Sequence, residues 1–379
     1  MSDNANFPNF PRRRFLRHTA AGVATAGFPM IFTASKTHAA DKLTLLAWYG
    51  SGEPDVVAPF EEAYNVKVES KYYTGGDNML ALIVQSPPGT YDVILSDAEY
   101  VTQLRTADYL EKLDPADYPF DEFFPEFQKF PVPGFWEGDD LFAVPVSFGF
   151  LGVTYNTQFV DEKAARSYSV LWDKKVRGKV GHFDWYLPSM GCLSLYDGNP
   201  APYEIDGAAF AQLKKTMLSL RPQVKGFFDY GGVLSSLRNA EVHAMCGIGD
   251  WISGVLEKDG APIKTVVPEE GGIQFTEGLS IGKNSSKPEL AKKLIQYMTS
   301  PEGNLRKALM KAYPTTATNR RAWENLNRDD PAEAKRSGMN LSSPNMIDDM
   351  RAGRVHIRRL PVRQSIEDWN DAWLEYKNA

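Results

Sequence analysis

Strand-like and helix-like segments alternate along the chain after residue 40, and this alternation restricts the fold more than any other feature of the sequence. Residues 41–49, 66–73 and 91–96 have the patterning of strands, whereas residues 56–64 and 74–83 have helical spacing. A further helix follows the third strand. Because strands joined by helices pair in parallel and carry the helices on both faces, this order predicts an α/β fold with a mostly parallel sheet.

Aromatic and acidic side chains stand where two of these predicted strands end. Trp48 and Tyr49 close the first strand, and Asp97 and Glu99 follow the third. In sheets of this kind, ligands bind beyond the carboxyl ends of the strands. These four side chains therefore mark a candidate ligand site.

The residues before position 41 are typical of an export signal. Residues 11–17 read Pro-Arg-Arg-Arg-Phe-Leu-Arg, a weakly apolar run covers residues 20–32, and small residues precede Asp41. This is the build of a secretory signal, and the arginines followed by Phe-Leu resemble the twin-arginine type. We expect cleavage near Ala40 and a periplasmic mature protein. The alternative, a basic amphipathic helix, is disfavoured by two glycines and a proline inside the apolar run.

Length, charge and cysteine content narrow the class of protein. The chain has 379 residues, enough for two domains, and its apolar content of 43 % supports a packed core. Residues 1–40 hold five basic groups and one acidic group, so their removal changes the net charge from −6 to −10. An acidic chain argues against a nucleic-acid partner. Two cysteines, Cys192 and Cys246, exclude a disulfide scaffold and a multi-cysteine zinc site.

Motifs of catalysis and of cofactor binding are missing from the sequence. It contains no phosphate loop and no H-E-x-x-H metal spacing. We therefore expect a protein that is not an enzyme and that holds no metal or cofactor.

Pairs of an aromatic residue with an acid recur instead at the ends of predicted strands. Aromatic faces offer cation–π contacts and carboxylates accept charge-assisted hydrogen bonds from ammonium, so the combination suits an organic amine. The alternative is that the rings fill cores and the acids cap helices. The residues concerned are Trp48, Tyr49, Asp97, Glu99, Asp184, Trp185, Tyr186, Asp250, Trp251, Phe275 and Glu277.

Several stretches give the chain a resemblance to a known family. The most specific is Val-Pro-Glu-Glu-Gly-Gly at residues 267–272, which is followed by Phe275 and Glu277. Others are Leu-Leu-Ala-Trp at residues 45–48 and Tyr-Asp-Val-Ile-Leu at residues 91–95. Because these stretches follow one another in the same order as in that family, the chain resembles the periplasmic solute-binding proteins of ABC importers. The resemblance is greatest to their spermidine/putrescine-binding group.

The resemblance implies a two-lobed periplasmic-binding-protein fold, type II-like, in which two discontinuous α/β lobes are joined by a hinge. Lobe 1 would comprise residues 41–148 plus 278–323, and lobe 2 residues 149–277 plus 324–379. The candidate crossovers lie around residues 147–150 and 276–279. The resemblance further implies a monomer that closes around a small organic cation and is then recognised by an ABC permease in the inner membrane.

Part of the family's pocket is matched residue by residue. Trp48 matches an aromatic residue that walls the polyamine, and Tyr313 matches a pocket tyrosine. Phe275 stands where the family has a tryptophan, and Glu277 stands where it has an aspartate that binds a ligand amine.

The other half of the pocket departs from the family pattern. Asp97 and Glu99 replace a small hydroxyl residue and a tyrosine, and Asp184 lies one position away from a family acid. Pro188 takes the place of a second acid. The ligand-binding residues expected from sequence are Trp48, Tyr49, Asp97, Glu99, Phe148, Asp184, Trp185, Asp250, Trp251, Phe275, Glu277 and Tyr313.

The sequence therefore predicts a periplasmic receptor for a polyamine-like cation. An opine-like zwitterion is an alternative, with Arg351, Arg354 or Arg358 available for its carboxylate, and a polyol or an anion would suit the same receptor fold. Ferric iron is disfavoured because no pair of tyrosines ends a strand in the second lobe. A last alternative is an exported enzyme that uses Asp97 and Glu99 as an acid/base pair.

Overall fold

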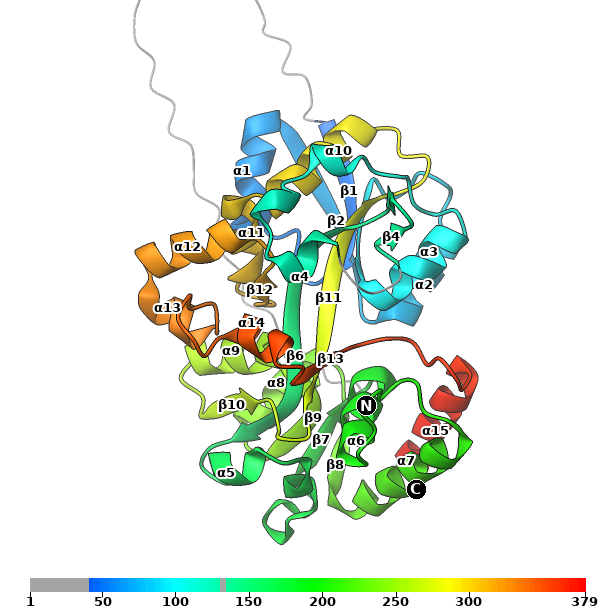
Figure 1. Cartoon of the computed structure of the whole chain (residues 1–379), viewed down its shortest axis with the longest axis vertical. Coiled ribbons are helices and arrows are strands. Elements are labelled where there is room, and N and C mark those ends of the chain that lie inside the picture. Colours follow the sequence, from blue (N-terminus) through cyan, green and yellow to red (C-terminus); the bar gives the residue numbers. More distant parts are fainter. Residues whose placement is uncertain (1–40, 130–133) are drawn as a thin grey trace, which may run out of the picture. The chain divides into compact units, whose positions relative to one another are not determined.

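Two long strands at the centre of one sheet organise the chain. A computed structural model describes residues 41–129 and 134–379, so the predicted export signal lies outside the described residues. β6 (Val144–Asn156) and β11 (Gly272–Ile281) pair antiparallel, and every residue of both is buried. They run between the two groups of parallel strands (Figure 1). The predicted crossovers at 147–150 and 276–279 lie within these two strands.

The first group of strands follows the alternation expected from sequence. β1 (Asp41–Trp48) lies between β2 (Val66–Tyr73) and β3 (Val93–Asp97), and all three are parallel. β3 then pairs antiparallel with β11 and places Asp97 opposite Glu277. The helices that alternate with these strands are α1 (Pro54–Tyr64), α2 (Gly76–Gln85) and α3 (Ala98–Thr106). The α/β prediction is confirmed for this half.

The second group, on the other side of β6, also consists of parallel strands that alternate with helices. β7 (Val180–Phe183) pairs in parallel with β8 (Val224–Phe228) and with β9 (Ala244–Gly249), and β9 pairs antiparallel with β6. A helix begins within three residues of each strand's carboxyl end. These helices are α6 (Tyr186–Tyr196) after β7, α8 (Tyr230–Arg238) after β8 and α9 (Asp250–Lys258) after β9.

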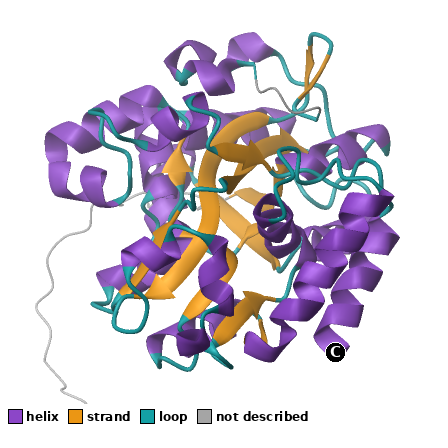
Figure 2. Ribbon diagram, turned by 60° about the horizontal axis from the view of Figure 1, so that its bottom comes forward, coloured by secondary structure: helices purple, strands orange, loops and turns teal. Residues whose placement is uncertain are grey.

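Among the described residues, the main sheet has eleven strands, and eight of them follow the order β2-β1-β3-β11-β6-β9-β7-β8. β10 (Ile263–Val266) and β12 (Thr316–Ala317) also pair with β6, while β4 (Trp136–Glu137) and β5 (Asp140–Leu141) form a separate hairpin. Helices lie on both faces of the sheet (Figure 2). The remaining helices are α4 (Pro125–Gln128), α5 (Glu162–Ala165), α7 (Gly207–Leu220), α10 (Pro288–Thr299), α11 (Pro301–Ala308), α12 (Arg320–Asp329), α13 (Pro331–Arg336) and α14 (Met346–Arg351).

The C-terminal segment returns to the middle of the sheet. β13 (Val355–Ile357) pairs in parallel with β11. The next residue, Arg358, donates its backbone N–H to the carbonyl oxygen of Gln274 at 2.7 Å. The chain then continues to α15 (Ile366–Asn378), whose Trp369 is fully buried. Arg358 is therefore held in the centre of the molecule by a strand on one side and an anchored helix on the other.

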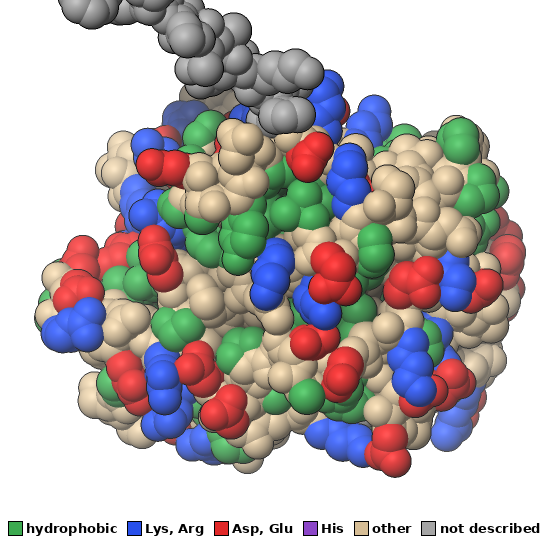
Figure 3. All heavy atoms as spheres, turned by 90° about the horizontal axis from the view of Figure 1, so that it is seen from above, with side chains coloured by type: hydrophobic (Ala, Val, Ile, Leu, Met, Phe, Trp, Pro, Cys, Tyr) green, Lys and Arg blue, Asp and Glu red, His purple; other side chains and the backbone are tan. Residues whose placement is uncertain are grey.

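Surface charges contribute little to the stability of this fold. On the face shown in Figure 3, basic and acidic side chains are interspersed. Exposed pairs such as Lys42–Glu69 and Arg238–Asp259 are typical of the surface, and each stabilises a protein by only about 0–1 kcal/mol. Most of the stability therefore comes from the buried aliphatic and aromatic side chains around the sheet.

The close packing of Gly149 against Phe275 predicts that no larger side chain is tolerated at position 149. A Cβ atom on Gly149 of β6 would lie 2.5 Å from a ring carbon of Phe275 on β11. We expect Gly149→Ala to lower the free energy of unfolding by about 1–3 kcal/mol through overpacking. Gly207→Ala is the matched control, because a Cβ there meets no atom within 4 Å. Equal urea midpoints for the two variants would contradict this account.

Candidate functional site

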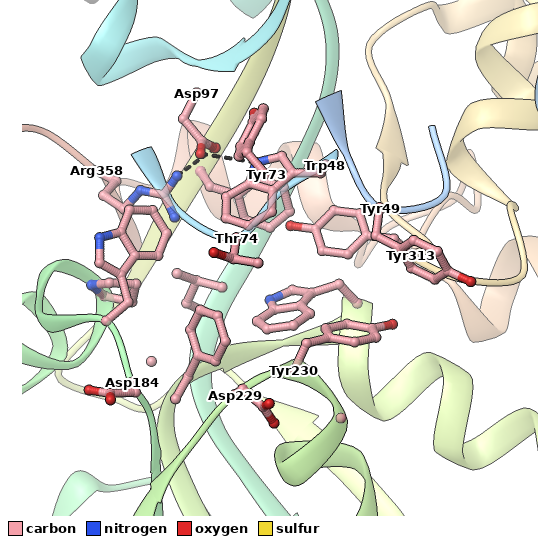
Figure 4. A pocket seen from close by; sticks show the side chains of 18 residues that line it. Trp48, Tyr49, Tyr73, Thr74, Asp97, Asp184, Asp229, Tyr230, Tyr313 and Arg358 are labelled. Carbon is pink, nitrogen blue, oxygen red and sulfur yellow. Dashed lines mark hydrogen bonds and ion pairs between the residues drawn. The ribbon is translucent and has the colours of Figure 1, made fainter. Parts of the chain in front are cut away.

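A cavity of about 360 Å³ lies at the strand ends of both parallel groups. Trp48, Tyr73 and Asp97 are the last residues of β1, β2 and β3, and Phe183 is the last residue of β7. This is the position at which open α/β sheets bind ligands. Figure 4 shows the side chains around the cavity. The lining consists of Trp48, Tyr49, Tyr73, Thr74, Asp97, Leu151, Phe183, Asp184, Trp185, Pro188, Asp229, Tyr230, Gly231, Gly247, Trp251, Phe275, Tyr313 and Arg358.

Eight of the twelve residues expected from sequence line this cavity, and four do not. The eight are Trp48, Tyr49, Asp97, Asp184, Trp185, Trp251, Phe275 and Tyr313. Glu99 and Glu277 lie behind the wall and are buried. Phe148 packs in the core against Phe127 and Phe150. Asp250 faces Arg336, and Oδ1 of Asp250 lies 3.8 Å from Nη1 of Arg336.

Sequence reasoning missed Asp229 and Tyr230 altogether. They form an acid–aromatic pair directly after β8, which is the pattern that located the other pairs. Recognition of residues 224–228 as a strand would have been enough to find them. Arg358 was considered only as one of three arginines for a ligand carboxylate. Of those three, Arg351 pairs with Glu126 and Arg354 pairs with Asp349, so only Arg358 reaches the cavity.

Rings from the two groups of strands meet across the cavity. Trp48 stacks on Tyr313 with ring centroids 6.3 Å apart and lies 6.1 Å from Trp185. Trp251 lies 5.4 Å from Tyr313 and 5.8 Å from Tyr230. The hydroxyl of Tyr230 also donates to the carbonyl oxygen of Ala312. The cavity is therefore enclosed mainly by aromatic surface.

The guanidinium of Arg358 occupies the place where the sequence predicted a ligand amine. Its Nη2 lies 2.6 Å from Oδ1 of Asp97, and its Nε donates to Oε1 of Glu99 at 2.6 Å. Its central carbon lies 4.5 Å from the centroid of the Trp185 ring and 5.9 Å from that of Phe275. Two carboxylates and two rings are the surroundings that suit a cation, and here the cation belongs to the chain.

The carboxylate of Glu277 also has an internal counter-ion. Nζ of Lys307, from α11, lies 3.0 Å from Oε2 of Glu277, and both side chains are fully buried. Ser147 of β6 donates its hydroxyl to the same oxygen. Lys307 further lies 5.6 Å from the ring centroid of Tyr313. Both acids at the centre of the sheet, Asp97 and Glu277, are thus paired within the protein.

Burial dominates the ionisation of the acids near Arg358. Desolvation raises the pKa of Asp97 to about 8, and the nearby Arg358 opposes this shift only in part. Desolvation likewise raises the pKa of Glu99, again against the effect of Arg358. The charge of the neighbouring Glu99 adds a smaller upward shift to the pKa of Asp97. Nε1 of Trp48 donates to Oδ2 of Asp97 at 3.2 Å and compensates a little of this cost.

The acids on the other side of the cavity have different surroundings. Asp184 accepts hydrogen bonds from Nζ of Lys377 at 2.6 and 2.7 Å. Asp229 is exposed and caps α8 by accepting the N–H of Gly232 at 2.7 Å. Within the described part of the chain, no ion pair involves Asp229. Asp229 is therefore the lining carboxylate with no cation beside it.

Neither a metal centre nor a membrane span is found in residues 41–129 and 134–379. No cluster of three or more His, Cys, Asp or Glu side chains there is arranged to hold a metal ion. His182 is buried in β7 and bonded to the hydroxyl of Tyr376 at 2.9 Å. Cys192 and Cys246 are both buried and free. No helix in these residues is long and apolar enough to cross a bilayer.

An α/β fold with an aromatic cavity at the strand ends of two parallel groups is the architecture of a small-solute receptor. A family model described as bacterial extracellular solute-binding protein matches residues 55–334. The chain therefore belongs to this family. The family's members bind solutes for ABC transporters and are not enzymes, which confirms the prediction of an extracytoplasmic binding protein over that of an exported enzyme.

Individual relatives agree with this assignment. The spermidine/putrescine-binding periplasmic protein of Escherichia coli is 27 % identical over 315 residues, which cover 80 % of this chain and 84 % of that protein. A structure described as a putative spermidine/putrescine ABC transporter from Listeria monocytogenes superposes with a TM-score of 0.73 at 19 % identity, covering 89 % of this chain and 99 % of that one. The structure of MotA from A. tumefaciens B6 in complex with glucopine superposes with a TM-score of 0.67 at 17 % identity. The match covers 89 % of this chain and 99 % of that one. The two-lobed fold is confirmed.

The Lys307–Glu277 pair predicts a large stability effect. Lys307→Met leaves the Glu277 carboxylate buried without a counter-ion, so we expect the free energy of unfolding to fall by about 3–5 kcal/mol. The double variant Lys307→Met/Glu277→Gln removes both charges and recovers most of this loss. Urea unfolding of the two variants and the parent chain is the measurement. An equal loss in the single and double variants would contradict a role for Glu277 as the partner of Lys307.

The pKa of Asp97 predicts how stability changes with pH. Because the pKa is raised in the folded chain, the folded state binds more protons than the unfolded state between about pH 4 and pH 8. This contribution to stability is full at low pH and is lost as the pH rises through 8. Asp97→Asn removes it, so its free energy of unfolding falls less steeply with pH than that of the parent. Asp229→Asn, which removes an exposed acid of the same cavity, is the control. Parallel pH profiles for the parent and Asp97→Asn would refute the shift.

Proposed function

We propose that this chain is the extracytoplasmic receptor of an ABC import system and that it captures an organic cation of the polyamine type. The observation that carries the proposal is the composition of the cavity lining. Nine aromatic rings and three carboxylates, those of Asp97, Asp184 and Asp229, face a single guanidinium. Asp97 and Asp184 are paired with Arg358 and Lys377, so Asp229 is the acid that attracts a cation, and the rings add cation–π and methylene contacts. The relatives from Escherichia coli and Listeria monocytogenes, both described as spermidine/putrescine proteins, support the same class of ligand.

Capture would proceed by closure of two lobes around the ligand. In the proposed division, lobe 1 comprises residues 41–148 plus 278–323, and lobe 2 comprises residues 149–277 plus 324–379. Each lobe contributes rings and an acid to the lining. A ligand that touches both lobes stabilises the closed form over the open one. A permease in the inner membrane then recognises the closed monomer.

Delivery to the periplasm is part of the same proposal. The pattern of residues 11–17 supports export by the twin-arginine route, and the small residues before Asp41 support cleavage near Ala40. A receptor placed there meets solutes that enter from outside the cell and passes them to its permease.

Asp229 provides the test of amine binding. We expect putrescine or spermidine to bind the purified chain in isothermal titration calorimetry and Asp229→Asn to weaken that binding about tenfold or more, through loss of a charge-assisted hydrogen bond. Asparagine still caps α8, so the fold is preserved. Asp206→Asn is the matched control, because Asp206 caps α7 in the same way and does not line the cavity. If no alkylamine, with or without an acid group, binds the parent chain, the proposed ligand class is wrong.

A further inference from the structure

Arg358 cannot share its position with a ligand ammonium group. The guanidinium is held by Asp97 and Glu99 at 2.6 Å each and lies against the Trp185 ring. A second cation at the same acids would be repelled strongly in this buried setting. Removal of Arg358 would break two buried ion pairs, which is unfavourable. The amine of the ligand therefore has to bind elsewhere in the cavity.

One edge of the guanidinium remains available to the ligand. Nε and Nη2 face Glu99 and Asp97, whereas Nη1 takes part in no hydrogen bond or ion pair between described residues. Nη2 itself makes an ion pair but no hydrogen bond of normal geometry. The side chain is only 4 % exposed, yet it lines the cavity. A buried cation with unused donors on an aromatic cavity wall suits an anionic oxygen acceptor, and a carboxylate matches it best.

The cavity is therefore polarised from one end to the other. Figure 4 shows Arg358 close to Asp97 at one side and Asp229 on the opposite side, with aromatic rings between them. Asp184 is already paired with Lys377, so Asp229 is the acid that can receive an amine. A ligand with a carboxylate at one end and an amine at the other matches both ends.

The ionisation of Asp97 is compatible with an anion beside it. Burial raises the pKa of this carboxyl to about 8, so its negative charge is weakened near neutral pH. Arg358 balances the charge of Glu99, so Asp97 adds only a weak repulsion to an anion beside the guanidinium. Lys307 and Glu277 behind the wall also balance each other.

We infer that Arg358 binds a carboxylate of the ligand and that the solute is an aminoalkyl carboxylate, with its amine at Asp229, rather than a simple diamine. This inference rests on the proposed receptor function and narrows its ligand from amines in general to amines that carry an acid group. The aromatic rings between Arg358 and Asp229 contact the alkyl chain that joins the two groups.

The test compares ligands of equal length that differ only in one end group. We expect 4-aminobutanoate, 5-aminopentanoate or 6-aminohexanoate to bind the full chain at least tenfold more tightly than the diamine of the same carbon number in calorimetry. Tight binding of diamines without binding of any amino acid would overturn the inference and leave the receptor proposal intact. Binding of neither class would overturn both.

Variants of Arg358 test whether the carboxylate of the ligand binds at this residue. Arg358→Lys keeps the charge but loses the planar pair of donors, so it is expected to weaken binding of the amino acid at least tenfold and to reduce its preference over the diamine by a similar factor. If that variant does not fold, Arg358→Gln combined with Asp97→Asn and Glu99→Gln removes the whole charge cluster and is expected to abolish the preference for the amino acid. An unchanged preference in either folded variant would overturn the role of Arg358.

Discussion

The pairing of β11 with three other strands is the constraint on which the site depends. β11 joins β3, β6 and β13, so it brings together segments that are far apart in the chain. Pairing with β3 sets Glu277 opposite Asp97, and pairing with β13 leads directly to Arg358. Because all ten residues of β11 are buried, the charges that these strands carry must find partners inside the protein.

The internal cations Arg358 and Lys307 distinguish this cavity from an aromatic receptor site whose acids are unpaired. An aromatic receptor with unpaired acids would take a cation from outside, but here Arg358 and Lys307 satisfy the central acids. A buried ion pair is weak evidence for added stability, since desolvation offsets most of the attraction. Its consequence here is chemical: the centre of the cavity offers a guanidinium to a ligand, while Asp229 at the rim remains the acid without a cation beside it.

Much of the fold and most of the aromatic wall could be predicted from local sequence. The alternation of segments between residues 41 and 105 is a local property, and Trp48, Trp185 and Trp251 stand at strand ends that periodicity reveals. Phe148 shows the limit of this reasoning, because alternation along β6 could not tell the cavity side from the core side of a strand buried on both faces.

The sequence by itself determined the class of fold, the family and the aromatic, acidic character of the strand ends, because these depend on residue types and on spacing along the chain. Only the tertiary structure decided which acids remain available to a ligand. Glu277 and Lys307 are 30 residues apart, and Glu99 and Arg358 are 259 apart, so no local pattern reports that they pair. Partners of buried charges are chosen by strand pairing and packing, and in this chain that choice converted a predicted amine site into a site with its own cation.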